Sequence, residues 1–261
     1  DADGQSGAGE GMACDEVLLP VATMYVSLEP CSHYGKTPPC ADLIISKGVR
    51  RVVVGCVDEF SEVQGRGIAK LRNAGVDVTV GVLEDDCRTL NRRFFTFHRE
   101  HRPYVILKWA QTANGLLDDN GEALQISNAF TQMLVHKMRA EEDAVIVGHT
   151  TDNREHPLLT VRHWHGQNPK RLVMTRNRPL KMLMDDLYQH GIQSLIVEGG
   201  RQTHDAFLMA GIWDEISMET NPELVVTGGT EAPKIPTTAR LVSSRCYYGN
   251  TVARYVNKEV R

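Results

Sequence analysis

The sequence alternates short apolar runs, rich in β-branched residues, with stretches in which apolar positions recur at helical spacing. In its first part the pattern predicts strands over 24–28, 51–55 and 76–82 and helices over 41–47, 67–74 and 84–99. Gly48 and Gly75 follow two of these helices, where a glycine suits the left-handed position that ends a helix. Strands that alternate with helices indicate an α/β layer architecture.

A polar stretch that ends in a proline, Arg99–Pro103, separates this part from a fresh apolar strand. Beyond it the pattern predicts strands over 104–109, 144–148, 171–174, 194–197 and 215–218 and helices over 128–140, 181–190 and 202–210. The sequence therefore predicts two α/β domains, residues 1–102 and 103–261.

Composition narrows the class of protein further. Lys and Arg total 29 against 33 Asp and Glu, a formal net charge of -4, and no basic run concentrates positive charge. This balance argues against a nucleic-acid partner. No apolar stretch approaches the roughly 20 residues that a bilayer requires, and the first residues show no export signal. We expect a cytoplasmic protein with no membrane and no nucleic-acid partner.

The densest chemical signal lies between a strand end and a helix start, at Cys31 and Cys40. Six cysteines are too few in this chain for a disulfide scaffold, so a reducing setting and free thiols are expected. Two thiolates there can bind zinc, and the helix start is expected to lower a thiol pKa. A catalytic zinc needs a third protein ligand, and no histidine precedes His33. The segment thus offers half of a zinc site, or two structural cysteines.

Two further segments carry candidate binding groups. His33, Lys36 and Thr37 are donors beside a helix start, suited to a substrate phosphate, or they form an ordinary polar surface loop. In Val197–Gly200 a strand delivers the carboxylate of Glu198, and glycines follow whose backbone amides can approach a pyrophosphate. An ordinary turn is the alternative for the second segment.

Residues 25–40, Tyr-Val-Ser-Leu-Glu-Pro-Cys-Ser-His-Tyr-Gly-Lys-Thr-Pro-Pro-Cys, closely resemble the deaminase domain of the bifunctional riboflavin-biosynthesis deaminase/reductase family. The resemblance continues through Gly65–Gly67, Leu107–Gly115, Arg139–Glu141, Leu159–Arg162 and Val197–Gly200 and covers nearly the whole chain. It implies a cytidine-deaminase-like three-layer domain followed by a dihydrofolate-reductase-like domain. It also implies zinc in the first domain, NADPH in the second and a homo-oligomer.

The resemblance assigns roles residue by residue. Cys31 and Cys40 would hold zinc together with the His of an upstream His-Ala-Glu motif, whose Glu would be catalytic. The given sequence lacks that motif, because Gly11 runs directly into Met12 where the family carries it. Either the sequence joins segments of a longer chain, which we favour, or a deletion leaves the deaminase domain without its catalyst. A similar junction falls between Leu180 and Lys181, where the family has further structure.

The deaminase substrate would contact His33, Lys36 and Thr37. The reductase substrate would contact Lys108, Arg139, Leu159, Arg162 and Glu198, with the arginines on its phosphate and Glu198 on the pyrimidine amino group. NADPH would contact Ala110, Thr151, Glu155, Gly200, Arg201, Gln202, Thr203, His204, Asp205 and Ala206.

The expected function is therefore hydrolytic deamination of a phosphoribosylamino-pyrimidine in riboflavin biosynthesis, followed by NADPH-dependent reduction of its ribosyl group to ribityl. The partners would be small, phosphorylated pyrimidines. One alternative is a reductase whose deaminase-like domain is catalytically dead. A zinc-dependent nucleic-acid deaminase and a non-catalytic nucleotide-binding module are the others. Zinc content, NADPH binding and ammonia release would separate these four.

Overall fold

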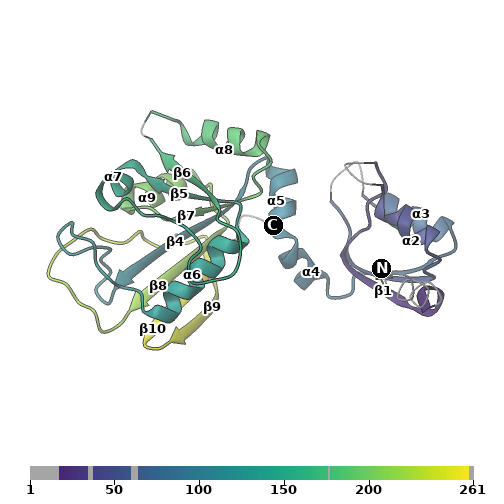
Figure 1. The fold of residues 1–261 in the computed structure, drawn as a ribbon, viewed down its shortest axis with the longest axis horizontal. Helices are drawn as coiled ribbons and strands as arrows, with labels where there is room; N and C mark the ends of the chain where they lie inside the picture. Colours follow the sequence, from purple (N-terminus) through teal and green to yellow (C-terminus); the bar gives the residue numbers. More distant parts are fainter. Residues whose placement is uncertain (1–17, 35–37, 60–63, 176, 259–261) are drawn as a thin grey trace, which may run out of the picture. The chain divides into compact units, whose positions relative to one another are not determined.

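The computed structural model of the 261-residue chain describes residues 18–34, 38–59, 64–175 and 177–258. The chain divides into two compact units, Asp1–Arg99 and Glu100–Arg261 (Figure 1). The junction between Gly11 and Met12 lies outside the described residues. None of the described helices is both long and apolar enough to cross a bilayer.

The first unit is built on a parallel sheet of three strands in the order β1-β2-β3. Its elements are the 3₁₀ helix η1 (Leu19–Val21), β1 (Thr23–Leu28), α2 (Cys40–Ser46), β2 (Arg51–Cys56), α3 (Arg66–Asn73), β3 (Asp77–Val80), α4 (Glu84–Leu90) and α5 (Arg92–Glu100). The central strand, β2, is buried at every position after Arg51, as its continuous apolar run requires. Its core valines pack with Ile44 of α2 and Leu71 of α3.

The single helix predicted over 84–99 is wrong, because the structure divides it into α4 and α5 at Asn91. The amide nitrogen of the Asn91 side chain donates to the Cys87 carbonyl oxygen at 2.8 Å, so the side chain competes for a helical acceptor. Leu90 consequently lies 67% exposed, whereas Phe95 and Phe97 are buried. Leu90 therefore does not share the buried face that carries Phe95 and Phe97.

The second unit contains a mixed sheet of seven strands in the order β6-β5-β7-β4-β8-β10-β9. Its elements are β4 (Tyr104–Thr112), α6 (Ala129–Glu141), β5 (Ala144–Gly148), α7 (His149–Glu155), β6 (Lys170–Met174), α8 (Leu180–Gln189), β7 (Ser194–Val197), α9 (Arg201–Met209), β8 (Glu215–Asn221), β9 (Ala239–Tyr247) and β10 (Asn250–Asn257). The first five strands in this order pair in parallel, and β10 runs antiparallel to β8 and β9. The sequence pattern did not predict α7, β9 or β10.

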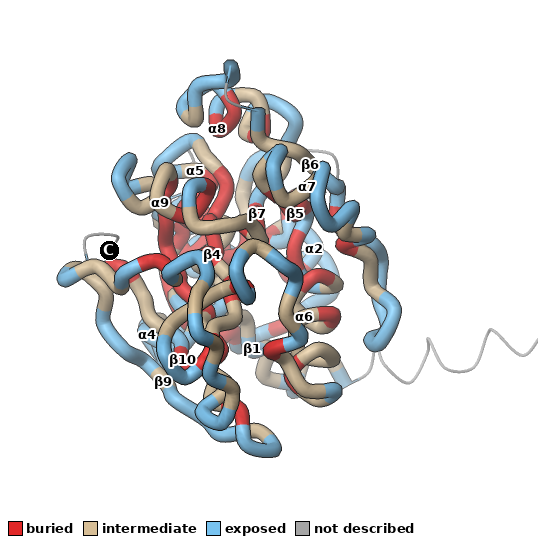
Figure 2. The backbone as a smooth tube through the Cα atoms, turned by 90° about the vertical axis from the view of Figure 1, so that its left-hand side faces the viewer, coloured by how far each residue is buried: buried red, intermediate tan, exposed pale blue. Residues whose placement is uncertain are grey.

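Helices cover both faces of this sheet. On one face Leu107 of β4 packs with Leu183 of α8 and Phe207 of α9. On the other, Val145 of β5 packs with Met138 of α6. Figure 2 shows the buried segments gathered along β4, β5 and β7, the central parallel strands. Because these strands run in one direction, their carboxyl ends meet at one edge of the sheet.

At the junction between Leu180 and Lys181 the chain continues without a break into α8, which begins at Leu180. Pro179 precedes the helix in an extended conformation that suits a residue just before a first turn. In this structure β6 is therefore connected directly to α8 and lies at the edge of the sheet beside β5.

Candidate functional site

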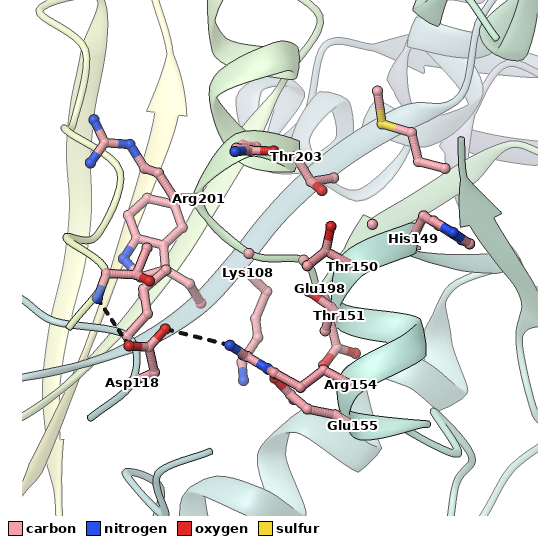
Figure 3. A pocket seen from close by; sticks show the side chains of 18 of the residues that line it. Lys108, Asp118, His149, Thr150, Thr151, Arg154, Glu155, Glu198, Arg201 and Thr203 are labelled. Carbon is pink, nitrogen blue, oxygen red and sulfur yellow. Dashed lines mark hydrogen bonds and ion pairs between the residues drawn. The ribbon is translucent and has the colours of Figure 1, made fainter. Parts of the chain in front are cut away.

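A cavity of about 590 Å³ lies at the carboxyl ends of the central strands of the second unit (Figure 3). Its size suits a cofactor or a small substrate. Of the residues that the sequence assigned to substrate and cofactor, it is lined by Lys108, Ala110, Thr151, Glu155, Glu198, Gly200, Arg201, Gln202 and Thr203. Arg139, Leu159, Arg162, His204, Asp205 and Ala206 lie outside its lining. The fold thus places two of the five predicted substrate contacts, Lys108 and Glu198, in one cavity with most of the predicted cofactor contacts.

The start of α9 opens onto this cavity, and the turn that leads into it consists of Gly199 and Gly200. A side chain on Gly199 would meet Thr203, because its Cβ would lie 2.7 Å from the Thr203 Cβ atom. A Cβ on Gly148, at the end of β5, would lie 2.3 Å from the Thr203 hydroxyl oxygen. Gly200 caps α9 without a side-chain hydrogen bond, and the Thr203 N–H donates to the Gly200 carbonyl oxygen at 3.0 Å. Among the described residues, the N–H groups of Arg201 and Gln202 are therefore the ones that can face a ligand. Such a cradle fits the pyrophosphate of a dinucleotide.

Glu198 and Arg139 form a bidentate ion pair beside the cavity. Arg139 donates from Nε and Nη2 to the two carboxylate oxygens of Glu198, each at 2.7 Å. The side chains are only 11% and 10% exposed. Burial alone would raise the pKa of Glu198, but the hydrogen bonds from Arg139 and the charges of Lys108, Arg139 and His136 outweigh it and lower that pKa. Glu198 is therefore a carboxylate that stays ionised.

This pairing bears on the role expected for Arg139. Its guanidinium is occupied by Glu198 and also donates from Nη1 to the Thr160 carbonyl oxygen at 3.3 Å. A direct contact of Arg139 with a substrate phosphate thus stays a prediction, while the structure shows it orienting Glu198. Arg162 differs, because it is exposed and its Nη1 atom donates to Thr160 Oγ1, two residues before it, at 3.1 Å.

His204, one of the residues assigned to the cofactor, is fully buried in α9. Its ring lies 5.3 Å from the Trp109 ring, centroid to centroid. Neither ring nitrogen has a hydrogen-bond partner within the described ranges. Burial, followed by the charge of Lys108, lowers the pKa of His204 to about 4, so the ring is neutral at physiological pH. His204 therefore packs beneath the cavity wall, without forming part of its lining.

Asp118 and Arg154 are cavity residues that sequence reasoning missed (Figure 3). Asp118 is buried and accepts the N–H groups of Gly121 and Thr230. Burial would raise the pKa of Asp118, but these hydrogen bonds and the charge of Arg154, 3.8 Å away, lower it. No local motif marks these residues, since the loop carrying Asp118 and the helix α7 meet only in the folded chain. The pair closes one side of the cavity.

In the first unit, Cys31 and Cys40 are brought together as predicted. The Cys40 backbone N–H donates to Cys31 Sγ at 3.2 Å. The lowered thiol pKa expected at the helix start is wrong for Cys40, because its hydrogen bond with the Cys31 thiol, followed by burial, raises the pKa of Cys40 from its ordinary value. His33 is exposed, and Lys36 and Thr37 lie outside the described residues. Within those residues, no group of three or more His, Cys, Asp or Glu side chains could hold a metal ion.

Glu29, which the sequence reasoning did not single out, organises the backbone next to Cys31. Its carboxylate is 4% exposed and accepts the N–H groups of Asp58, Gly65, Gly67 and Ile68 at 2.9–3.2 Å. Two of these donors belong to the first turn of α3, so Glu29 caps that helix from a strand end. A Cβ on Gly67 would lie 1.9 Å from the Pro30 carbonyl oxygen, which explains the glycine there. The sequence signal that could have identified Glu29 is an acidic residue directly after an apolar strand.

A sequence model described as the RibD C-terminal domain matches residues 103–179 and 178–247. The riboflavin biosynthesis protein RibD of Aquifex aeolicus is 35% identical over 252 residues, covering 79% of this chain and 71% of that protein. The chain belongs to the RibD family. RibD of Bacillus amyloliquefaciens is 30% identical over 263 residues, covering 82% of this chain and 70% of that protein.

A solved structure also matches this RibD chain along most of its length. It is the Thermotoga maritima protein described as a diaminohydroxyphosphoribosylaminopyrimidine deaminase/5-amino-6-(5-phosphoribosylamino)uracil reductase. The match has a TM-score of 0.82 and 28% identity and covers 90% of this chain and 79% of that one. The resemblance to the riboflavin-biosynthesis family and the expected α/β fold class are thereby confirmed. The RibD C-terminal match lies in the unit that carries the cavity.

Proposed function

We propose that this RibD protein deaminates a phosphoribosylamino-pyrimidine in its first unit and reduces the ribosyl group of the product with NADPH in its second. Family membership supports both activities, because the Aquifex relative aligns over 252 residues and the Thermotoga neighbour is described with both. For the same reason the reductase-only alternative is not favoured. The observation that carries the reductase assignment is the cavity, in which the ionised Glu198 lies beside the start of α9, a helix start without a side-chain cap.

The residues present fit a bound NADPH. The Gly199–Gly200 turn and the first turn of α9 would hold its pyrophosphate, with Thr151 and Glu155 of α7 lining the same cavity. When bound, the cofactor supplies the hydride, so the protein needs no nucleophile. The chain's own residues bind and orient the substrate. Glu198, held by Arg139, accepts hydrogen bonds from the pyrimidine amino group, and Lys108 lies on the strand beside it.

Replacing Arg162 by Ala tests the reductase assignment. We expect the KM for 5-amino-6-(5-phosphoribosylamino)uracil to rise about ten- to hundredfold, because a charge-assisted phosphate contact is worth about 1.5 to 3 kcal/mol. The kcat should change little, since the lost contact is made in the ground and transition states alike. Steady-state kinetics with NADPH measure the KM and the kcat. The same measurement with NADH tests the choice of cofactor. Arg240→Ala, at an exposed position of β9, is the matched control.

An unchanged KM in Arg162→Ala would refute the phosphate assignment. Comparable catalytic efficiency with NADH and NADPH would overturn the choice of cofactor, which rests on family resemblance.

Zinc in the first unit is the second part of the proposal. Cys31 and Cys40 would supply two thiolate ligands of the kind that zinc prefers. The described residues offer no third ligand, so the donor set seen here does not complete a zinc site and we derive no catalytic step from it. The support for zinc is the adjacency of the two thiols together with family membership.

Cys40→Ser should remove stoichiometric zinc and the release of ammonia while leaving NADPH oxidation largely intact. The reason is that a serine hydroxyl does not ionise readily enough to replace a thiolate ligand. Metal analysis of the purified full chain and an ammonia assay measure the two effects. Cys246→Ser, an exposed cysteine of the second unit, is the control. Full retention of zinc by Cys40→Ser would exclude this ligand.

A further inference from the structure

A buried histidine of α6 is hydrogen-bonded to the loop that carries Arg162. His136 is 4% exposed, and its Nδ1 atom accepts the backbone N–H of Arg162 at 3.0 Å. Arg139, one turn farther along α6, donates to the carbonyl oxygen of Thr160 at 3.3 Å. Two side chains from the same helix thus hold the backbone just before the exposed guanidinium of Arg162.

The loop contains backbone that needs such support. His156 and Leu159 have φ angles of 43° and 55°, in the left-handed region that residues other than glycine rarely adopt. Conformations of this kind persist only where the surrounding structure fixes them. Leu159 is buried against Val145 and Ile196, whereas residues 162–168 are exposed. The His136 hydrogen bond therefore lies where the loop leaves the core.

We propose that His136 is a positioning residue for the reductase substrate, because its bond to the Arg162 backbone fixes the place from which the Arg162 guanidinium reaches the substrate phosphate. This inference rests on the proposed function, which assigns Arg162 to that phosphate. His136 itself touches neither substrate nor cofactor in this scheme.

The hydrogen bond requires a neutral histidine, since a protonated Nδ1 is a donor and would oppose the Arg162 N–H. The groups that face His136 are Arg139 of α6, Arg162 and His163 of the loop, and Glu198 at the end of β7. The His163 ring packs edge-on against it, with centroids 4.8 Å apart. Burial, followed by the charges of Arg139, Arg162 and His163, lowers the pKa of His136, while the Thr160 carbonyl acts in the opposite direction. The acceptor form thus predominates at neutral pH, and the bond is lost as the pH falls through this lowered pKa.

A double-mutant cycle on the full chain tests the inference. His136→Leu removes the acceptor and should raise the KM for 5-amino-6-(5-phosphoribosylamino)uracil about five- to tenfold, with kcat and the Kd for NADPH unchanged. His136→Asn places an oxygen at the position of Nδ1 and should stay within about twofold of wild type. In the Arg162→Ala background, His136→Leu should have no further effect on KM, because the two residues act through one contact. His190→Leu, at an exposed position, is the control.

The pH profile gives a second readout. The substrate phosphate titrates near pH 6 in every variant, so only the difference between variants is informative. As the pH is lowered from about 7.5 to about 5.5, the KM of wild type should rise more steeply than that of His136→Asn, which cannot protonate. Hydrogen exchange of the Arg162 amide, without any ligand, should be slow in wild type and His136→Asn and fast in His136→Leu.

The possible outcomes separate this inference from the proposed function. If Arg162→Ala raises KM while His136→Leu matches wild type, or if the two effects add fully, His136 does not act through Arg162 and only the inference fails. If Arg162→Ala leaves KM unchanged, the phosphate assignment fails and the inference fails with it. Should His136→Leu not fold, parallel pH profiles of wild type and His136→Asn would still overturn the positioning role.

Discussion

Glu198→Gln should lower the reductase kcat about a hundredfold. The carboxylate accepts both N–H groups that Arg139 directs at it, each at 2.7 Å, and Glu198 lines the cavity. An amide replaces one oxygen by a donor, which opposes the Arg139 N–H and weakens the bond to a substrate amino group. A loss of about 1.5 to 3 kcal/mol in the transition state corresponds to roughly ten- to hundredfold, and the disturbed pair places the effect at the upper end.

The same substitution should also destabilise the second unit, by about 2 kcal/mol, because a guanidinium that is only 11% exposed loses its counter-charge. All three tryptophans, Trp109, Trp164 and Trp213, lie in this unit, so tryptophan fluorescence during urea unfolding reports on it. The Glu198 pKa is lowered on folding, so the pair stabilises above the unfolded pKa of about 4.5 and this contribution is lost as the pH falls through the folded value. Glu198→Gln should lose this dependence.

The double variant Arg139→Met, Glu198→Gln separates catalysis from stability. Removing both charges should restore much of the stability, since no buried charge is left unpaired. Turnover should stay low, because the carboxylate is still missing. If turnover recovers together with stability, Glu198 is a structural residue and its role toward the substrate is refuted. Glu223→Gln, at an exposed position, should behave as wild type in both assays.

Glu29→Ala should reduce the stability of the first unit by about 3 to 5 kcal/mol. The substitution leaves four backbone N–H donors without their carboxylate acceptor and removes the cap of α3. Glu29→Gln keeps the shape but turns one acceptor into a donor, so an intermediate loss of about 2 kcal/mol is expected. Far-ultraviolet circular dichroism during urea unfolding measures the effect on helices and strands.

The tryptophans offer an internal control, because none of the three lies in the first unit. The dichroism of Glu29→Ala should show an earlier transition whose midpoint is absent from the fluorescence. Asp77→Asn, at a side chain that is 72% exposed, should shift neither signal. A wild-type dichroism midpoint in Glu29→Ala would show that water or another group replaces the carboxylate without cost.

Local sequence patterns predicted the elements of the fold correctly where a helix buries one face or a strand is buried on both sides. The apolar runs that become β2, β5 and β7 were recognisable because strands of a parallel sheet are buried on both sides. The hairpin of β9 and β10 was not, because β9 is exposed along most of its length and shows no alternation. Tyr248 and Gly249, with φ angles of 50° and 95°, form a two-residue hairpin turn. This turn could not be recognised in the sequence, because no periodic strand pattern precedes it.

The sequence by itself determined the α/β alternation, the family and the segments that carry chemistry, because burial period and motif spacing are local properties of the chain. Only the tertiary structure decided which charges meet. Arg139 and Glu198 lie 59 residues apart, and Glu29 reaches donors up to 39 residues away. Such pairings depend on strand order and helix placement, and no local pattern encodes either. In both units a buried carboxylate directly follows an apolar strand, and only the fold selected the donors that it accepts.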